Sequence, residues 1–196
     1  MRFRNPTVIL SNNNERRILN QNRTETQGEG DKMKKLYLIN GTMGVGKTTI
    51  GQILKKKLNK SVFLDGDWCW DSHPFQVTDE TKAMVIDNIC YLLNNFLRCT
   101  AYENIVFCWV MDRQEIIDTV LNRLDTENVD VKIVSLVCSE EALTRRIDKD
   151  VRAGLRRVSS IENSISRLSS YYALDSIKID TTAKTPEEVA EMVLRL

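Results

Sequence analysis

A glycine-rich stretch near position 45 has the spacing of a phosphate-binding loop. Residues 41–48 read GTMGVGKT and fit the pattern G-x-x-x-x-G-K-[ST], in which glycine lets backbone N–H groups turn inward around phosphate oxygens. The Lys47 ammonium would reach the β- and γ-phosphates, and the Thr48 hydroxyl would enter the coordination shell of Mg²⁺. We therefore expect a nucleoside triphosphate to contact one continuous run of residues: Gly41, Thr42, Met43, Gly44, Val45, Gly46, Lys47, Thr48 and Thr49.

Two carboxylates and two indole rings follow the second apolar run of the chain. Residues 63–75 read FLDGDWCWDSHPF, and the two-residue period of a strand would point Asp65 and Asp67 to the same face. Ligands of parallel α/β sheets bind beyond the carboxyl ends of the strands, so these carboxylates should face the triphosphate. Trp68 and Trp70 could stack on a flat or sugar-like acceptor, with core packing as the alternative for one of them.

Arginines are concentrated late in the chain. Gly154 and the pair Ser159-Ser160 interrupt the helical pattern there, so the arginines around them would sit on a mobile flap. Arginines that close over a transferred phosphoryl group stabilise its charge and exclude water. A solvated helix face is the alternative for Arg145 or Arg146 and for Arg157. The full set is Arg145, Arg146, Arg152, Arg156 and Arg157, followed by Arg167 on the next helix.

Strand-like and helix-like periods alternate through the rest of the chain. Strands are predicted over 35–40, 61–65, 104–111, 131–137 and 176–181. Helices are predicted over 50–58, from Thr78 to Leu97, and over 114–125, 140–149 and 160–172, with a last helix that begins at a capping box after Thr185. This alternation predicts an α/β fold: a five-stranded parallel sheet between two layers of helices, with an arginine-rich lid.

The composition indicates one intracellular domain. The chain has 196 residues, 42% of them hydrophobic, and a net charge of +1, so no overall field recruits nucleic acid or a membrane. No apolar run is long enough to cross a bilayer, and the five scattered cysteines suit reduced thiols in the cytoplasm. Residues 1–32 are rich in Asn and Arg and predict a disordered extension, with an RNA-binding arm or an organelle presequence as alternatives. The domain should span residues 33–196.

From Met33 to Leu196 the chain resembles the small P-loop kinases of the nucleoside-monophosphate-kinase superfamily, including shikimate and gluconate kinases. The shared pattern is the P-loop, the D-x-D after the second strand, the arginine lid and the final strand before DTTAKTPEEVAEMV. The resemblance implies ATP and Mg²⁺ as cofactors. It also implies that Asp65 supports the metal and that Asp67 orients the acceptor hydroxyl and takes its proton.

The same resemblance assigns roles to the arginines. Arg152 and Arg156 match lid arginines that contact ATP and the transferred phosphoryl group, and Arg145 is the candidate to lie over the base. Arg167 matches an arginine that reaches toward the phosphoryl group or the acceptor. Asp112 is a rival carboxylate for Mg²⁺.

Absent motifs narrow the function. There is no [NT]-K-x-D guanine reader and no D-x-x-G switch, and a motor or an AAA-type ATPase would need a longer chain. Between Gly51 and Leu97 there is no arginine, which leaves Arg113 as the one candidate to grip the phosphate of a nucleotide acceptor. His73 could be a general base, although His73–Pro74 equally suits a turn.

We therefore expect an ATP-dependent phosphotransferase that acts on a hydroxyl of a small-molecule acceptor of sugar-acid, metabolite or antibiotic type. A nucleoside monophosphate kinase that uses Arg113 is one alternative. A nucleotide-binding regulatory or RNA-associated protein is the other. The identity of the acceptor, the choice between ATP and GTP, and the oligomeric state stay open.

Overall fold

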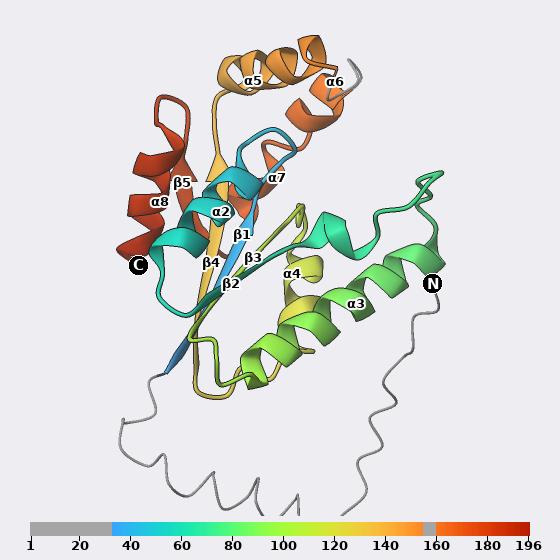
Figure 1. Cartoon of the computed structure of the whole chain (residues 1–196). Coiled ribbons are helices and arrows are strands. Elements are labelled where there is room, and N and C mark those ends of the chain that lie inside the picture. Colours follow the sequence, from blue (N-terminus) through green and yellow to red (C-terminus); the bar gives the residue numbers. More distant parts are fainter. Residues whose placement is uncertain (1–32, 155–159) are drawn as a thin grey trace, which may run out of the picture. The chain divides into compact units, whose positions relative to one another are not determined.

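The computed structural model describes residues 33–154 and 160–196, which belong to one α/β unit spanning Met33–Leu196. Its centre is a five-stranded sheet in the order β2-β3-β1-β4-β5, and every neighbouring pair of strands is parallel (Figure 1). Parallel neighbours need a crossover between them, which the intervening helices supply. The predicted parallel sheet is confirmed. Its strands are β1 (Lys34–Asn40), β2 (Ser61–Asp65), β3 (Asn104–Trp109), β4 (Val129–Val137) and β5 (Ile177–Asp180).

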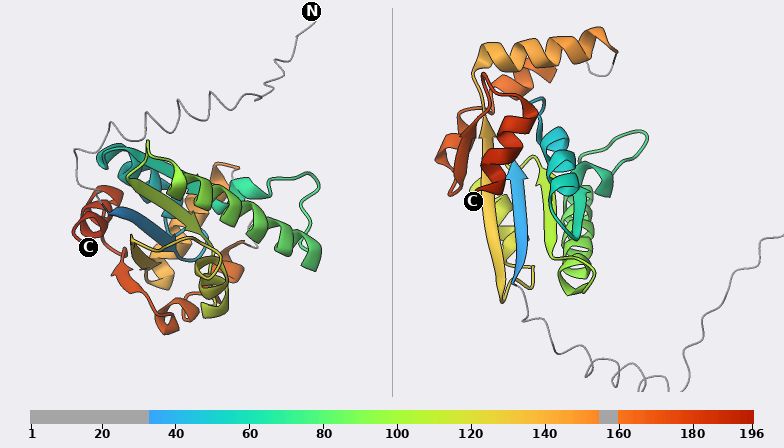
Figure 2. Two further views of the ribbon diagram at one scale, coloured as in Figure 1. Left: turned by 90° about the horizontal axis from the view of Figure 1, so that it is seen from below. Right: turned by 60° about the vertical axis from the view of Figure 1, so that its left-hand side comes forward.

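Helices cover both faces of the sheet (Figures 1 and 2). One face packs against α2 (Lys47–Lys57) and α8 (Pro186–Leu194), with the Tyr37 and Ile39 side chains of β1 in the shared core. The other face packs against α3 (Asp79–Arg98), α4 (Gln114–Leu121) and α7 (Ser170–Ala173), and there the core contains Leu36 and Leu38. Successive side chains of β1 point to opposite faces, and both faces are covered, so the middle of this central strand, residues 36–39, is apolar on both sides.

Two further helices lie beyond the carboxyl ends of the strands, where they form the top of the molecule in Figure 1. They are α5 (Glu140–Arg152) and α6 (Ser160–Ile165), and they pack against each other. A short 3-10 helix, η1 (Gly66–Cys69), follows β2 at the same end of the sheet. The carboxyl edge of the sheet is therefore surrounded by the P-loop, η1 and the two upper helices.

Local sequence signals explain where the helices begin. Thr185 accepts a hydrogen bond from the Glu188 N–H at 3.2 Å, and Glu188 accepts one from the Thr185 N–H at 2.8 Å, which confirms the predicted capping box. Pro186 occupies the first turn of α8, where its missing N–H costs nothing. Thr78 caps α3 in the same reciprocal way with Thr81.

The prediction of one helix over 160–172 was wrong. Residues 166–169 form a turn between α6 and α7, with the Leu168 N–H donating to the Ile165 carbonyl at 2.9 Å. The physical reason is burial on two sides: Leu168 packs into the core on the α2 face, and Tyr171 packs into the core on the α3 face. In one straight helix, side chains three residues apart lie on the same face, so Leu168 and Tyr171 could not pack against opposite faces of the sheet. Strand β3 and helix α4 also end earlier than predicted, at Trp109 and Leu121.

The five cysteines are free thiols, in keeping with their scattered spacing. Within the described residues, no helix combines the length and the apolar character needed to cross a membrane.

Candidate active site

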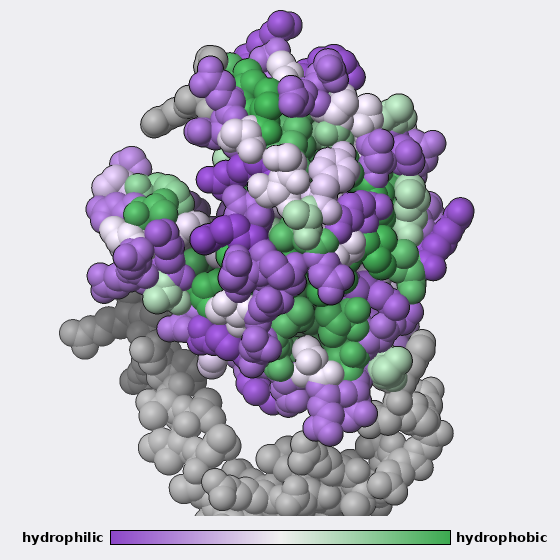
Figure 3. All heavy atoms as spheres, turned by 180° about the vertical axis from the view of Figure 1, so that it is seen from behind, coloured by the Kyte–Doolittle hydropathy of each residue, from purple (hydrophilic) through white to green (hydrophobic). Residues whose placement is uncertain are grey.

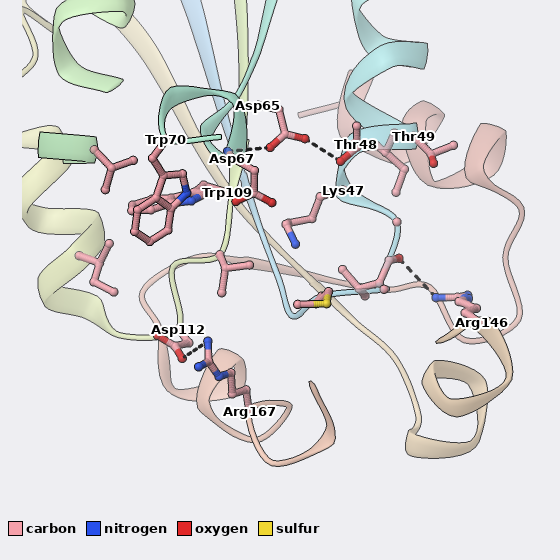
Figure 4. A pocket seen from close by; sticks show the side chains of 18 of the residues that line it. Lys47, Thr48, Thr49, Asp65, Asp67, Trp70, Trp109, Asp112, Arg146 and Arg167 are labelled. Atoms are coloured by element: carbon pink, nitrogen blue, oxygen red, sulfur yellow. Dashed lines mark hydrogen bonds and ion pairs between the residues drawn. The ribbon is translucent and has the colours of Figure 1, made fainter. Parts of the chain in front are cut away.

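A pocket of about 1320 Å³ opens at the carboxyl end of the sheet. The P-loop, the ends of β2 and β3, the first turns of α3 and α4, and the segments around α5 and α8 all contribute to its walls. Figure 4 shows the labelled side chains pointing into this space from the different elements. This placement brings the predicted phosphate loop and the predicted acidic pair into one cavity.

The P-loop has the backbone that its glycines predict. Gly44 adopts φ +84, and a Cβ atom placed there would lie 2.6 Å from the Ile147 Cγ1 on α5. Glycine is thus required at this position both for the left-handed conformation and for the close approach of α5. Gly46, at φ +108, caps α2 without a side chain, so the first N–H groups of the helix can meet an anion.

Most of the predicted phosphate-binding residues line the pocket. These are Met43, Gly44, Val45, Gly46, Lys47, Thr48 and Thr49. Gly41 and Thr42 do not line it. Thr42 is fully buried, and its hydroxyl donates to the Ser164 carbonyl of α6 at 2.9 Å. This hydrogen bond connects the start of the P-loop to α6. The Lys47 Nζ donates to the Thr42 carbonyl at 3.1 Å and points into the cavity (Figure 4).

Thr48 and Asp65, the two predicted metal-side residues, are joined by a hydrogen bond. The Thr48 hydroxyl donates to Asp65 Oδ2 at 2.7 Å, and Asp65 is only 5% exposed at the end of β2. The other carboxylate oxygen of Asp65 accepts the Asp67 N–H at 3.1 Å, which fixes the orientation of the group. Mg²⁺ prefers oxygen donors and keeps several waters and substrate phosphates in its shell, so one hydroxyl backed by a carboxylate fits it.

Asp67 lies in a different environment. The indole N–H groups of Trp109 and Trp70 lie near its carboxylate, and their rings meet edge to face with centroids 6.1 Å apart. Desolvation by the pocket walls raises the pKa of Asp67, the negative charge of Asp65 raises it further, and Lys47 and the two indole donors lower it in part. Asp67 thus points into the pocket as a carboxylate that binds a proton more readily than an ordinary aspartate.

The structure separates the two tryptophans that the sequence paired. Trp70 lines the pocket, whereas Trp68 is 56% exposed, packs edge-on against Phe63 and lies outside the lining. We expected both indole rings to face the acceptor. The chain turns into the 3-10 helix η1 directly after Asp65, and this turn sets the directions of the two rings. Side chains three residues apart share a face of such a helix, so Asp67 and Trp70 face the pocket together and Trp68 is rotated away.

A similar difference applies to the base side of the pocket. Arg145 is exposed and does not line the pocket, but Arg146 does. Arg146 donates to the Thr181 hydroxyl at 2.9 Å, to the Thr181 carbonyl at 2.6 Å and to the Val45 carbonyl at 3.4 Å. The apolar stripe of α5 could have revealed this, because Leu143 is buried three residues before Arg146 and therefore lies on the same side of the helix.

The remaining predicted residues are distributed as follows. Arg167 and Arg113 line the pocket, and Arg167 pairs with Asp112 at 3.4 Å (Figure 4). Asp112 therefore faces a guanidinium, whereas Asp65 faces the P-loop hydroxyl, which favours Asp65 as the metal-side carboxylate. Arg152 is exposed at the end of α5 and does not line the pocket, and Arg156 lies outside the described residues. His73 is exposed and is also not part of the lining.

Known proteins resemble this chain over most of its P-loop unit. A family model described as an AAA domain matches residues 38–163. A shikimate kinase of Bacillus cytotoxicus is 28% identical over 172 residues, which cover 83% of this chain and 98% of that protein. A putative adenylate kinase of Pyrococcus abyssi is 28% identical over 82% of this chain and 83% of its own length.

Solved structures share the fold. A tunicamycin resistance protein of Deinococcus radiodurans superimposes with a TM-score of 0.64 at 18% identity, covering 83% of this chain and 94% of that one. A gluconokinase of Sinorhizobium meliloti superimposes with a TM-score of 0.62 at 17% identity, covering 84% and 91%. The family match spans most of the P-loop unit. The chain belongs to the AAA domain family of P-loop proteins and stands among its small, shikimate- and gluconate-kinase-like members.

Proposed function

We propose that this protein is a kinase that transfers the γ-phosphoryl group of ATP, with Mg²⁺, to a hydroxyl group of a small molecule. The observation that carries the proposal is the arrangement of three groups in one pocket. Lys47 extends from the P-loop, Asp65 holds the Thr48 hydroxyl at 2.7 Å, and Asp67 stands beside them with a raised pKa. The shikimate kinases that match nearly their whole length support the same reaction class.

The nucleotide has a natural place in this pocket. Its phosphates would lie over Met43 to Thr49, and its base would lie toward Arg146 and the loop after β5, where Thr181 and Lys184 line the wall. Arg146 ties this loop to the P-loop carbonyl of Val45, so the two sides of the nucleotide site are held together. We assign ATP because the guanine-reading motif is absent from the sequence.

The reaction follows from the groups at the acceptor side. Asp67 accepts a hydrogen bond from the acceptor hydroxyl and takes its proton as the oxygen bonds to the γ-phosphorus. The bond from that phosphorus to the bridging oxygen breaks, and ADP and a phosphate ester are released. Lys47 stabilises the charge on the transferred group. Thr48, oriented by Asp65, would hold Mg²⁺, which when bound neutralises charge on the β- and γ-oxygens.

A nucleoside monophosphate kinase is the second candidate, because one relative is a putative adenylate kinase. Arg113 and Arg167 both line the pocket and could grip an acceptor phosphate. Arg167, however, is already paired with Asp112, and Arg113 is exposed at the start of α4. The regulatory or RNA-associated alternative depends on residues 1–32, outside the described part of the chain; retained kinase activity after their removal would dismiss it.

The decisive experiment is ADP release from Mg·ATP with a panel of unphosphorylated hydroxyl compounds and nucleoside monophosphates. We expect turnover with a hydroxyl compound and its loss in Lys47→Ala, while Lys149→Ala, a change of another pocket-lining lysine, retains it. Turnover confined to nucleoside monophosphates, with loss in Arg113→Ala, would replace the first proposal by the second. Tight ATP binding without any ADP release would contradict both.

A further inference from the structure

The half of the pocket beyond Asp67 is walled by apolar side chains from separate elements. Two come from the segment between η1 and α3, two from the second turn of α3, one from the end of β3 and one from α4, and the Trp70 ring joins them. This set, which we call the apolar wall, comprises Trp70, Phe75, Val77, Val85, Ile86, Trp109 and Ile116. These residues lie together only in the folded protein.

The apolar wall offers little to a compound with many hydroxyl groups. Among the described residues that line this half of the pocket, Thr119 supplies the one neutral side-chain hydroxyl, and no Ser, Asn, Gln, Tyr or His contributes. The indole N–H groups of Trp70 and Trp109 lie next to the Asp67 carboxylate and stabilise its charge. A sugar acid that buried its hydroxyls here would lose hydrogen bonds with water without replacing them, which is costly.

Charged side chains on this side do not require a charged acceptor. Arg167 pairs with Asp112 at 3.4 Å, and Lys82 pairs with Asp79 at 3.1 Å. The Asp71, Arg113 and Glu115 residues are exposed at the mouth, where their charges stay hydrated. The apolar side chains therefore determine which kind of acceptor fits against the inner wall of the pocket.

Part of the apolar wall is exposed to solvent. Phe75 and Val77 are each 56% exposed although both line the pocket, and Phe75 meets Trp70 edge to face at 5.0 Å. The segment before α3 projects from the body of the molecule, and Figure 3 shows a hollow between it and the α5–α6 end. An acceptor with an apolar surface would remove these side chains from water, a favourable change that a fully polar acceptor cannot supply.

We propose that the acceptor is an amphipathic compound, in which the reacting hydroxyl adjoins an aryl or alkyl body that packs against the apolar wall. This inference rests on the proposed kinase function and narrows the acceptor from hydroxyl compounds in general. Asp67 holds the hydroxyl at the inner end of the pocket, and the apolar body extends past Trp70 toward Ile86 and Ile116. Polyols and sugar acids are then poor acceptors.

The test uses 1,2-alkanediols of increasing chain length, because they share the same pair of adjacent hydroxyl groups and differ only in the length of the apolar tail. The full-length protein is loaded with Mg²⁺ and a non-hydrolysable ATP analogue, and binding of propanediol, hexanediol and octanediol is followed by tryptophan fluorescence. Burial of one methylene group contributes about 0.8 kcal/mol, which is about a fourfold gain in affinity per added methylene. Gluconate is the polar comparator, and ADP release from Mg·ATP is measured with the same compounds.

Two variants provide a matched control within α3. Ile86→Asn places an amide in the apolar wall, whereas Met84→Asn changes an exposed apolar residue two positions away that does not line the pocket. We expect the dependence on chain length to persist in Met84→Asn and to fall severalfold in Ile86→Asn. ATP-analogue binding should be unchanged in both, which shows that the P-loop is intact.

The outcomes separate this inference from the proposed function. The amphipathic acceptor would be overturned if no diol binds or if affinity does not rise with chain length. It would also be overturned if gluconate binds more tightly and is turned over, and in that case the proposed kinase function would stand. Affinity that rises with chain length in the absence of ADP release would support the apolar wall and contradict the kinase. A rise in both affinity and ADP release supports the two together.

Discussion

The two indole donors around Asp67 lead to a pH-dependent prediction. Trp109→Phe keeps an aromatic ring at the end of β3 and removes the indole N–H beside the Asp67 carboxylate. This N–H stabilises the charged form and lowers the pKa of Asp67, so its loss raises the pKa further. More of the enzyme then carries a protonated Asp67 at a given acidic pH, and the acidic limb of the activity profile moves to higher pH.

The size of the effect follows from the kind of bond that is lost. A hydrogen bond to a charged group contributes about 1.5–3 kcal/mol, and the lower end applies because Asp67 is open to solvent in the pocket. Since 1.4 kcal/mol is about tenfold in an equilibrium, the deprotonated fraction on the acidic limb should fall about tenfold. Well above the limb, where Asp67 is ionised in both proteins, kcat should change much less.

The assay is the pH profile of kcat/KM from ADP release, with Trp68→Phe as the control. Trp68 carries the same N–H but lies outside the pocket, packed on Phe63, so its variant should reproduce the parent profile. A limb that stays in place in Trp109→Phe, or that moves to lower pH, would refute the assignment of Asp67 as the proton acceptor. A uniform loss at all pH values would show that the ring's packing matters and its N–H does not.

Four further predictions address the rest of the site. Asp67→Asn should lower kcat by about 10²- to 10⁴-fold, as expected for a lost general base, with the Kd for Mg·ATP measured by a fluorescent analogue nearly unchanged; an equal loss of ATP binding would assign Asp67 to the metal. Asp65→Asn should instead raise the Mg²⁺ concentration needed for half-maximal turnover, because asparagine has no charge and keeps one oxygen for the two donors, the Thr48 hydroxyl and the Asp67 N–H, and an unchanged Mg²⁺ titration would argue against this role. Arg146→Ala should raise KM for ATP about tenfold through loss of its bonds to Thr181, whereas Arg145→Ala should leave it within about twofold, and the reverse order would restore Arg145 as the base-side residue. Gly44→Ala should lower the free energy of unfolding by more than about 1 kcal/mol, seen as a fall in Tm of about 2–4 °C or more, because its Cβ would meet Ile147 at 2.6 Å and φ is +84; an unchanged Tm would show that α5 can move aside.

Local patterns in the sequence predict much of this fold. The strands and helices follow from apolar periodicity, the last helix begins at the Thr185 capping box, and the P-loop spacing predicts the position of Lys47 and Thr48 in the pocket. Each of these depends on residues that are close in the chain. The hydrogen bond between Thr48 and Asp65 brings the two predicted metal-side residues together, because the carboxyl ends of parallel strands meet at the same edge of the sheet.

The sequence predicts less well where a side chain's direction depends on a turn of a few residues. Trp68 and Trp70 differ because η1 begins at Gly66, and apolar alternation cannot distinguish a continued strand from a 3-10 turn. Arg145 and Arg146 are separated by 100° on α5, so a resemblance matched to within a residue does not say which of them faces the nucleotide. The apolar wall combines positions between Trp70 and Ile116 whose proximity is a tertiary property, and no local pattern reports it.

Asp65 and Asp67 are two residues apart and yet suited to different tasks, which follows from their surroundings. Asp65 is buried, and its oxygens accept from the Thr48 hydroxyl and the Asp67 N–H, so both are committed to fixed donors. A group held in this way can orient a metal ligand, but it cannot move to follow a reacting hydroxyl. Asp67 lies beside two indole N–H groups, faces the cavity, and has a pKa that desolvation and the neighbouring Asp65 charge raise. It is therefore the carboxylate that can receive a proton during transfer, and the charge of Asp65 beside it makes that step easier.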